Sequence, residues 1–217
     1  MEETSAVQAP VLPLNPTHSA PMSNQVKVWD RCLHLSSPGG FGKTFAFQVI
    51  AAKIRSEGCI VLNVATTGLA AQNLIGGRTA HSRFKIPIPI QEHLTCSIKA
   101  QSDLAKLIRE TKLIVWDKVF SCHRYNVEAA DRTLQDITQT AKLFGGKVVC
   151  VSGDPRQTPT IVKRGGRATI VNACIQMSLL FSKFKQIYLT ENVRTDADEV
   201  DFFLLFDQSW GREGRNL

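Results

Sequence analysis

The sequence predicts an α/β domain in which helices cover both faces of a mostly parallel sheet. Short, β-branched apolar runs alternate with segments whose apolar residues recur at three- and four-residue spacing. Such alternation is typical of crossover units, which build a parallel sheet between two helical layers. A hydrophobic fraction of 43% over 217 residues is sufficient for a buried core.

The expected elements follow one another in order along the chain. Short apolar runs predict strands at residues 33–35, 59–65, 113–116, 148–151 and 186–189. Helical spacing of apolar residues predicts helices at residues 43–56, 102–110, 126–143 and 167–180. Gly58 stands in the C-terminal capping position of the first helix. Four prolines among Ser, Thr and Asn predict a disordered leader at residues 1–24, followed by one domain at residues 25–217.

The composition narrows the class of protein. There are 26 Lys and Arg against 19 Asp and Glu, and the resulting charge of +7 suits a polyanion such as nucleic acid. The six cysteines form no C-x-x-C pair and several lie in apolar runs, so we expect reduced thiols in an intracellular protein and no zinc site. No apolar stretch reaches the roughly 18 residues of a membrane span, so we expect no membrane partner.

The segment at residues 36–45, SSPGGFGKTF, carries the clearest chemical signal. It follows a predicted strand and precedes a predicted helix, which is the context of a phosphate-binding loop. Lys43 would reach the β- and γ-phosphates of ATP, and the Thr44 hydroxyl would bind Mg²⁺. Ser37 stands at the first glycine of the pattern, where a positive φ would strain a serine. The remaining glycines let backbone N–H groups surround the phosphates: Gly39, Gly40 and Gly42.

The predicted strand at residues 112–117 ends in Asp117, as in P-loop NTPases that present a carboxylate to Mg²⁺. The next residue is Lys118, where a glutamate would orient or deprotonate the attacking water. A cation cannot act as a general base, and losing one lowers a rate by about 10²–10⁴-fold. We therefore expect a chain that binds ATP and hydrolyses it poorly.

Two further strands end in polar turns, SGDPRQ at residues 152–157 and TENVR at residues 190–194. In an open parallel sheet, ligands bind at the carboxyl ends of the strands. We therefore expect these turns to meet the phosphate-binding loop and Asp117 around one nucleotide.

In their order along the chain and in their residues, these motifs resemble those of the PIF-type (petite integration frequency) ATP-dependent DNA helicases, in the version of plants, oomycetes and Helitron transposons. The resemblance covers residue 24 to about residue 211 and implies a P-loop NTPase fold, the three-layer first RecA-like motor domain. It also implies 5′–3′ DNA unwinding in repair, recombination and telomere maintenance, with ATP and Mg²⁺ as cofactors and single-stranded DNA as partner. We expect a nuclear protein, with the mitochondrion as the alternative.

The resemblance implies roles for residues around the nucleotide. Lys43 and Asp117 belong to the catalytic set, with Gln157 as γ-phosphate sensor and Arg194 as arginine finger. Gln25 is the best match to the glutamine that reads adenine.

Two segments are similar to family motifs on the DNA side, VATTGLAA at residues 64–71 and GGRTAHSRFKIPI at residues 76–88. Hydroxyls and backbone N–H groups after a strand suit a phosphate, and cations beside an aromatic ring suit a single strand. The alternative is that the cations form a solvated surface and the phenylalanine lies in the core. The residues assigned to DNA are Thr66, Thr67, Gly68, His81, Arg83 and Phe84.

The chain departs from the family pattern at Ser37, Lys118, Pro155 and Pro159, and we expect the second motor domain of the family to be absent after Arg194. We therefore expect a truncated form that does not unwind DNA alone. Three hypotheses stay open: a helicase fragment, which we prefer; a non-catalytic ATP- or single-strand-binding module; and a small P-loop kinase or other nucleotide-binding enzyme unrelated to DNA.

Overall fold

The computed structural model describes residues 32–37, 40–154, 160, 162 and 165–189, which exclude the predicted leader. Within these ranges, six strands form one sheet in the order β3-β2-β4-β5-β1-β6, and every neighbouring pair is parallel. This all-parallel sheet confirms the predicted fold class. The strands are β1 (Cys32–Ser36), β2 (Ile60–Ala65), β3 (Arg78–Thr79), β4 (Thr111–Asp117), β5 (Val148–Ser152) and β6 (Lys185–Tyr188).

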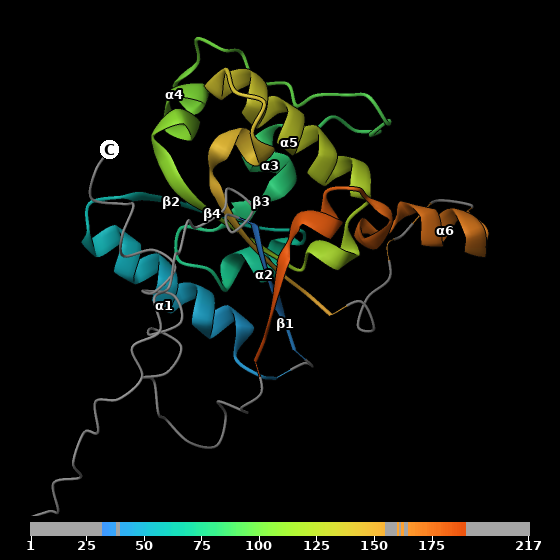
Figure 1. Ribbon diagram of the computed structural model, residues 1–217, viewed down its shortest axis with the longest axis horizontal. Helices are drawn as coiled ribbons and strands as arrows, with labels where there is room; N and C mark the ends of the chain where they lie inside the picture. Colours follow the sequence, from blue (N-terminus) through green and yellow to red (C-terminus); the bar gives the residue numbers. More distant parts are fainter. Residues whose placement is uncertain (1–31, 38–39, 155–159, 161, 163–164, 190–217) are drawn as a thin grey trace, which may run out of the picture.

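Helices cover both faces of the sheet (Figure 1). One face carries α1 (Lys43–Ser56) and α2 (Gly68–Gln72), and the other carries α3 (Ala80–Phe84), α4 (Asp103–Glu110) and α5 (Arg124–Thr138). After β5 come α6 (Arg167–Ala173) and the 3₁₀ turns η4 (Ile175–Met177) and η5 (Phe181–Lys183), while η2 (Val119–Ser121) and η3 (Leu143–Gly146) lie earlier in the chain. Each face has its own core, because successive strand residues point to opposite sides.

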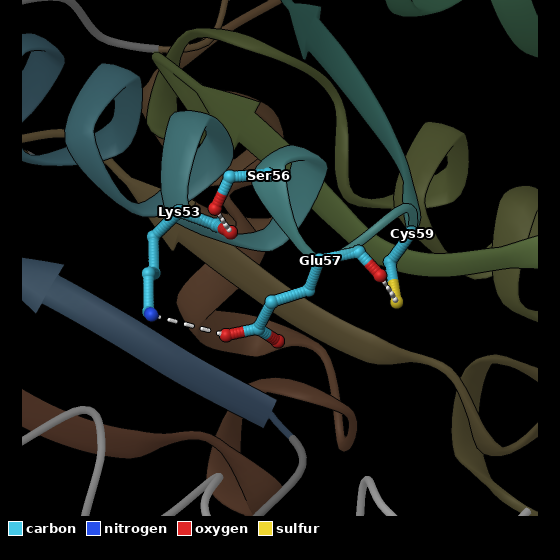
Figure 2. A network of polar contacts seen from close by, with 4 residues as sticks. All are labelled: Lys53, Ser56, Glu57 and Cys59. Atoms are coloured by element: carbon cyan, nitrogen blue, oxygen red, sulfur yellow. Dashed lines mark hydrogen bonds and ion pairs between the residues drawn. The ribbon is translucent and has the colours of Figure 1, made fainter.

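Helix α1 spans the predicted residues, and its last turn explains why the chain reverses there. Gly58 has a φ of 76°, in the left-handed region that favours glycine. The N–H groups of Gly58 and of the next residue donate to α1 carbonyls at 2.9 and 3.2 Å, which is a Schellman motif. Figure 2 shows the polar contacts around this turn, where the Lys53 ammonium lies 3.3 Å from the Glu57 carboxylate.

Two helices end earlier than predicted. Helix α5 ends at Thr138 because Gln139 adopts a left-handed φ of 54°. The following turn is fixed by the Asp131 carboxylate, which accepts the backbone N–H of Phe144 at 2.6 Å. The helix predicted at residues 167–180 ends at Ala173 and is followed by η4 and η5. The sequence also missed β3, α2 and α3, which are too short for their periodicity to show.

The cysteines confirm the predicted free thiols, because all six are unpaired and four are buried. Burial raises the pKa of Cys122 and of Cys150 to about 12, so both are neutral members of the core. Within the described residues, no helix combines the length and the apolar composition that crossing a membrane requires.

Candidate functional site

The carboxyl ends of three adjacent strands bring the phosphate-loop residues and Asp117 to one edge of the sheet. Strand β5 lies between β1 and β4, with Ser152 beside Leu35 and Val151 beside Trp116. The start of α1, the end of β4 and the end of β5 are therefore neighbours. Four residues assigned to the nucleotide lie outside the described ranges, and their roles stay predictions: Gln25, Gly39, Gln157 and Arg194.

Lys43 begins α1 and is turned back toward the end of β1. Its ammonium donates to the backbone carbonyl of Ser37 at 2.6 Å and to the Ser37 hydroxyl at 3.1 Å. Gly40 and Gly42 have φ values of 93° and 73°, so the loop needs glycine at both positions. Ser37 is not among the residues with positive φ, so the strain considered for this serine is absent.

Thr44 and Asp117 meet although 73 residues separate them in the sequence. The Thr44 hydroxyl donates to Oδ2 of Asp117 at 3.3 Å. The other carboxylate oxygen, Oδ1, accepts the Ser152 hydroxyl at 2.5 Å and the backbone N–H of Lys118 at 2.8 Å. Only 2% of Asp117 is exposed, and these donors hold its carboxylate in one orientation.

These oxygens fit the magnesium ion that the loop implies. Mg²⁺ prefers oxygen ligands and is commonly held by one or two carboxylates together with substrate phosphates and water. The Thr44 hydroxyl and the Asp117 carboxylate already converge, so these two residues would hold the ion. When bound, magnesium would neutralise charge on the phosphate oxygens.

The sequence predicts that the turn at residues 152–157 lies at this edge, but it assigns no separate role to Ser152 or Asp154. Ser152 is fully buried and orients Asp117. Asp154 is 9% exposed, and its negative charge acts on Lys43. The available signal was the run Ser-Gly-Asp directly after an apolar strand.

Lys118 adds a second cation to the site. It follows Asp117 with a left-handed φ of 58° and precedes η2. The pKa of Lys43 is lowered, chiefly by burial and next by the charge of Lys118, while Asp154 and Asp117 act in the opposite direction. A positive charge thus lies within electrostatic reach of Lys43 at the position of the expected glutamate.

In the first DNA-side segment, the two threonines make contacts within the protein. The Thr66 hydroxyl oxygen accepts the indole N–H of Trp116 at 3.3 Å. Thr67 is the N-cap of α2, and its side chain accepts the N–H of Ala70 at 3.3 Å. Gly68 is the first residue of α2 and, like Thr67, is exposed.

In the second DNA-side segment, residues 76–88, the structure contradicts the assignment of Phe84 to DNA contact. Phe84 is 1% exposed and packs against Trp116 with 5.7 Å between ring centroids. Its ring belongs to the core, so we remove it from the DNA-contacting set. His81 and Arg83 are half-buried, and burial lowers the pKa of both, with Arg78 contributing at Arg83.

An all-parallel sheet, a Gly-Lys-Thr loop after β1 and a carboxylate at the end of β4 define a P-loop NTPase domain of the RecA-like type. Residues 22–202 match the family of PIF1-like helicases, and the chain belongs to this family.

The chain is similar to known helicases over part of their length. It is 28% identical over 167 residues to the ATP-dependent DNA helicase Pif1 of Psychrobacter sp. (strain PRwf-1), covering 76% of this chain and 25% of the relative. It is 28% identical over 161 residues to the ATP-dependent DNA helicase RRM3 of Saccharomyces cerevisiae, covering 68% of this chain and 22% of the relative.

Solved structures show the same fold. The Pif1 helicase from Bacteroides in complex with ADP-AlF3 and ssDNA superposes with a TM-score of 0.65 at 24% identity, over 85% of this chain and 43% of that chain. The Pif1 helicase from Candida albicans gives a TM-score of 0.60 at 23% identity, over 86% and 42%. The chain thus spans less than half of these solved chains.

Proposed function

We propose that this chain is the nucleotide-binding motor part of an ATP-dependent 5′–3′ DNA helicase, with Mg²⁺ as cofactor and single-stranded DNA as partner. The observation that carries the proposal is the meeting of Thr44 with Asp117 at 3.3 Å, beside Lys43. The named relatives are ATP-dependent DNA helicases, and a Bacteroides relative binds ADP-AlF3 and ssDNA. We propose that this chain likewise binds an adenine nucleotide and single-stranded DNA.

The proposal includes a role in DNA repair, recombination and telomere maintenance, with the nucleus as the compartment. It also includes membership of the plant, oomycete and Helitron version of the family, which the order and the sequences of the motifs taken together support.

We call the edge of the sheet at the carboxyl ends of β1, β4 and β5 the nucleotide edge. Each of its polar residues has a physical role in this proposal. Lys43 would turn from Ser37 to the terminal phosphates, and the N-terminus of α1 adds positive potential there. The Ser152 hydroxyl and the Lys118 N–H keep the Asp117 carboxylate directed at the metal position.

A second candidate, a non-catalytic ATP- or single-strand-binding module, is favoured by Lys118. Its ammonium stands at the position of the water-activating glutamate and lies within electrostatic reach of Lys43. Binding would then be retained while hydrolysis is slow. The P-loop kinase hypothesis is set aside because the chain belongs to the helicase family.

The experiment is a titration with a non-hydrolysable ATP analogue and Mg²⁺, and separately with oligothymidylate. Lys43→Ala should abolish nucleotide binding and keep oligonucleotide binding, because it removes the charge that meets the phosphates. Lys53→Ala is the matched control, since Lys53 lies on the same helix with 51% of its side chain exposed. Unchanged nucleotide affinity in Lys43→Ala would show that the loop is not the site.

A further inference from the structure

Trp116 joins the DNA-side segments to the strand that carries the metal-binding carboxylate. It lies on β4 directly before Asp117 and is 1% exposed. Its ring packs against Phe84 of α3, with 5.7 Å between ring centroids. Its indole N–H donates to the Thr66 hydroxyl at 3.3 Å. One side chain therefore contacts both segments that the family motifs assign to DNA.

The backbone makes a second connection at the same place. Strands β2 and β4 are neighbours, and Ala65 is paired with Asp117 in the sheet. Just beyond this pair, the N–H of Thr66 donates to the carbonyl of Asp117 at 3.1 Å. Thr66 is thus attached to the end of β4 through its backbone and through its side chain.

The two faces of β4 contact different regions, the DNA-side segments on one face and the phosphate-binding loop on the other. Trp116 packs into the core beneath α3, whereas the Asp117 carboxylate contacts Thr44 at the start of α1. Successive residues of a strand point to opposite faces, so Trp116 and Asp117 face the two regions from one continuous piece of backbone. A phenylalanine at this position would keep a smaller aromatic ring in the core and would offer no donor to Thr66.

We propose that Trp116 is a positioning residue that couples occupation of the DNA-side segments to the orientation of Asp117, and so to the affinity for nucleotide with magnesium. The inference rests on the proposed function. A DNA phosphate at the Thr66–Thr67 turn would reorient the Thr66 hydroxyl, and the indole N–H follows its acceptor. Coupling of this kind is reciprocal, so nucleotide with magnesium changes DNA affinity by the same factor.

The test compares the Kd of a non-hydrolysable ATP analogue with Mg²⁺ in the absence and presence of saturating oligothymidylate. In the natural sequence these two Kd values should differ by about fivefold or more, the usual range for coupled sites. Trp116→Phe keeps an aromatic ring against Phe84 and loses the indole donor. In this variant the ratio of the two Kd values should fall toward one, whatever the Kd without DNA becomes.

Thr66→Val removes the acceptor of the same hydrogen bond and keeps the branched shape, so it tests the bond even if Trp116→Phe fails to fold. Both changes delete the bond between the indole and the Thr66 hydroxyl, although Thr66→Val also removes the contact with the Cys122 thiol. If the shared bond carries the coupling, the double variant should lose no more coupling than Thr66→Val alone. Phe184→Leu is the control for core packing, since Phe184 lies in the same core and packs against Phe144. It should keep the wild-type ratio.

The outcomes separate this inference from the proposed function. A wild-type ratio retained in both Trp116→Phe and Thr66→Val overturns the inference. A ratio of one in the natural sequence, with both ligands bound, also overturns it and leaves the proposed function standing. If the natural sequence binds neither ligand, the proposed function fails and the inference fails with it.

Discussion

The nucleotide edge and the DNA-side segments differ in what the side chains of their motifs contact. At the edge formed by β1, β4 and β5, Lys43, Thr44 and Asp117 belong to one set of contacts shared between elements. In the DNA-side segments, Thr67 caps a helix and Phe84 fills the core. Residues of a binding motif can thus serve the ligand directly or serve the fold that presents the ligand surface.

The largest expected effect tests the structural role of Phe84. Phe84→Ala should lower the free energy of unfolding by about 3–5 kcal/mol, because it removes a buried ring. Denaturant unfolding measures this change, with Phe45→Ala, at a side chain 43% exposed, as the control that should change far less. Unchanged stability together with lost oligonucleotide affinity would restore Phe84 to the DNA-contacting set.

Asp117→Asn should remove most of the magnesium dependence of nucleotide binding. The change keeps the shape of the side chain and removes the charge that a metal ligand supplies, so affinity with Mg²⁺ should fall about 10–100-fold. Titrations with Mg²⁺ and with a chelator measure the dependence, and Asp136→Asn, at an exposed position of α5, is the control. Oligonucleotide affinity without nucleotide should stay unchanged. Full magnesium dependence in Asp117→Asn would contradict the metal assignment.

Arg83→Gln should weaken oligonucleotide binding without affecting nucleotide binding, whereas Asp117→Asn should do the reverse. If Arg83 neutralises one phosphate, the slope of log K against log salt should fall by about 0.7. Binding isotherms at several salt concentrations give this slope, with Lys106→Gln at an exposed position of α4 as the control. The same slope in Arg83→Gln and the natural sequence would place Arg83 outside the DNA contact.

The smallest expected effect concerns the pH dependence of unfolding, in which two histidines, His34 and His81, should contribute unequally. Burial lowers the pKa of His34 on β1 and of His81 on α3 from the ordinary value of 6.5. Protonation therefore favours the unfolded state, and the stability contributed by the neutral rings is lost as pH falls below 6.5 toward the folded pKa. Because His34 is only 3% exposed and packs between Phe120 and Phe181, His34→Phe should flatten the pH dependence of unfolding more than His81→Gln. A larger effect of His81→Gln would contradict this order.

The sequence predicts five of the six strands and the places of Lys43, Thr44 and Asp117 at the strand ends, because these depend on local patterns. A glycine loop between a strand and a helix places Lys43 and Thr44, and an apolar strand places Asp117. Ser152 could not be predicted as a partner of Asp117, since that contact joins residues 35 positions apart through the strand order.

The DNA side was predicted less well because helices α2 and α3 have five residues each, too few for an apolar period to appear. Without that period, the inward direction of Phe84 could not be distinguished from an outward one. The early end of α5 was likewise missed, because Gln139 is not a glycine and nothing in the local sequence marks its left-handed φ of 54°.

The central claim is that the nucleotide edge binds ATP and that Lys118 limits its hydrolysis. The most direct test measures ATP turnover with and without single-stranded DNA in the natural sequence and in Lys118→Glu, with ATP binding measured in both. We predict binding in both proteins, little turnover in the natural sequence, and a DNA-stimulated rate about 10²-fold higher or more in Lys118→Glu. Equal DNA-stimulated turnover in the two proteins would contradict the claim, because another group would then activate the water.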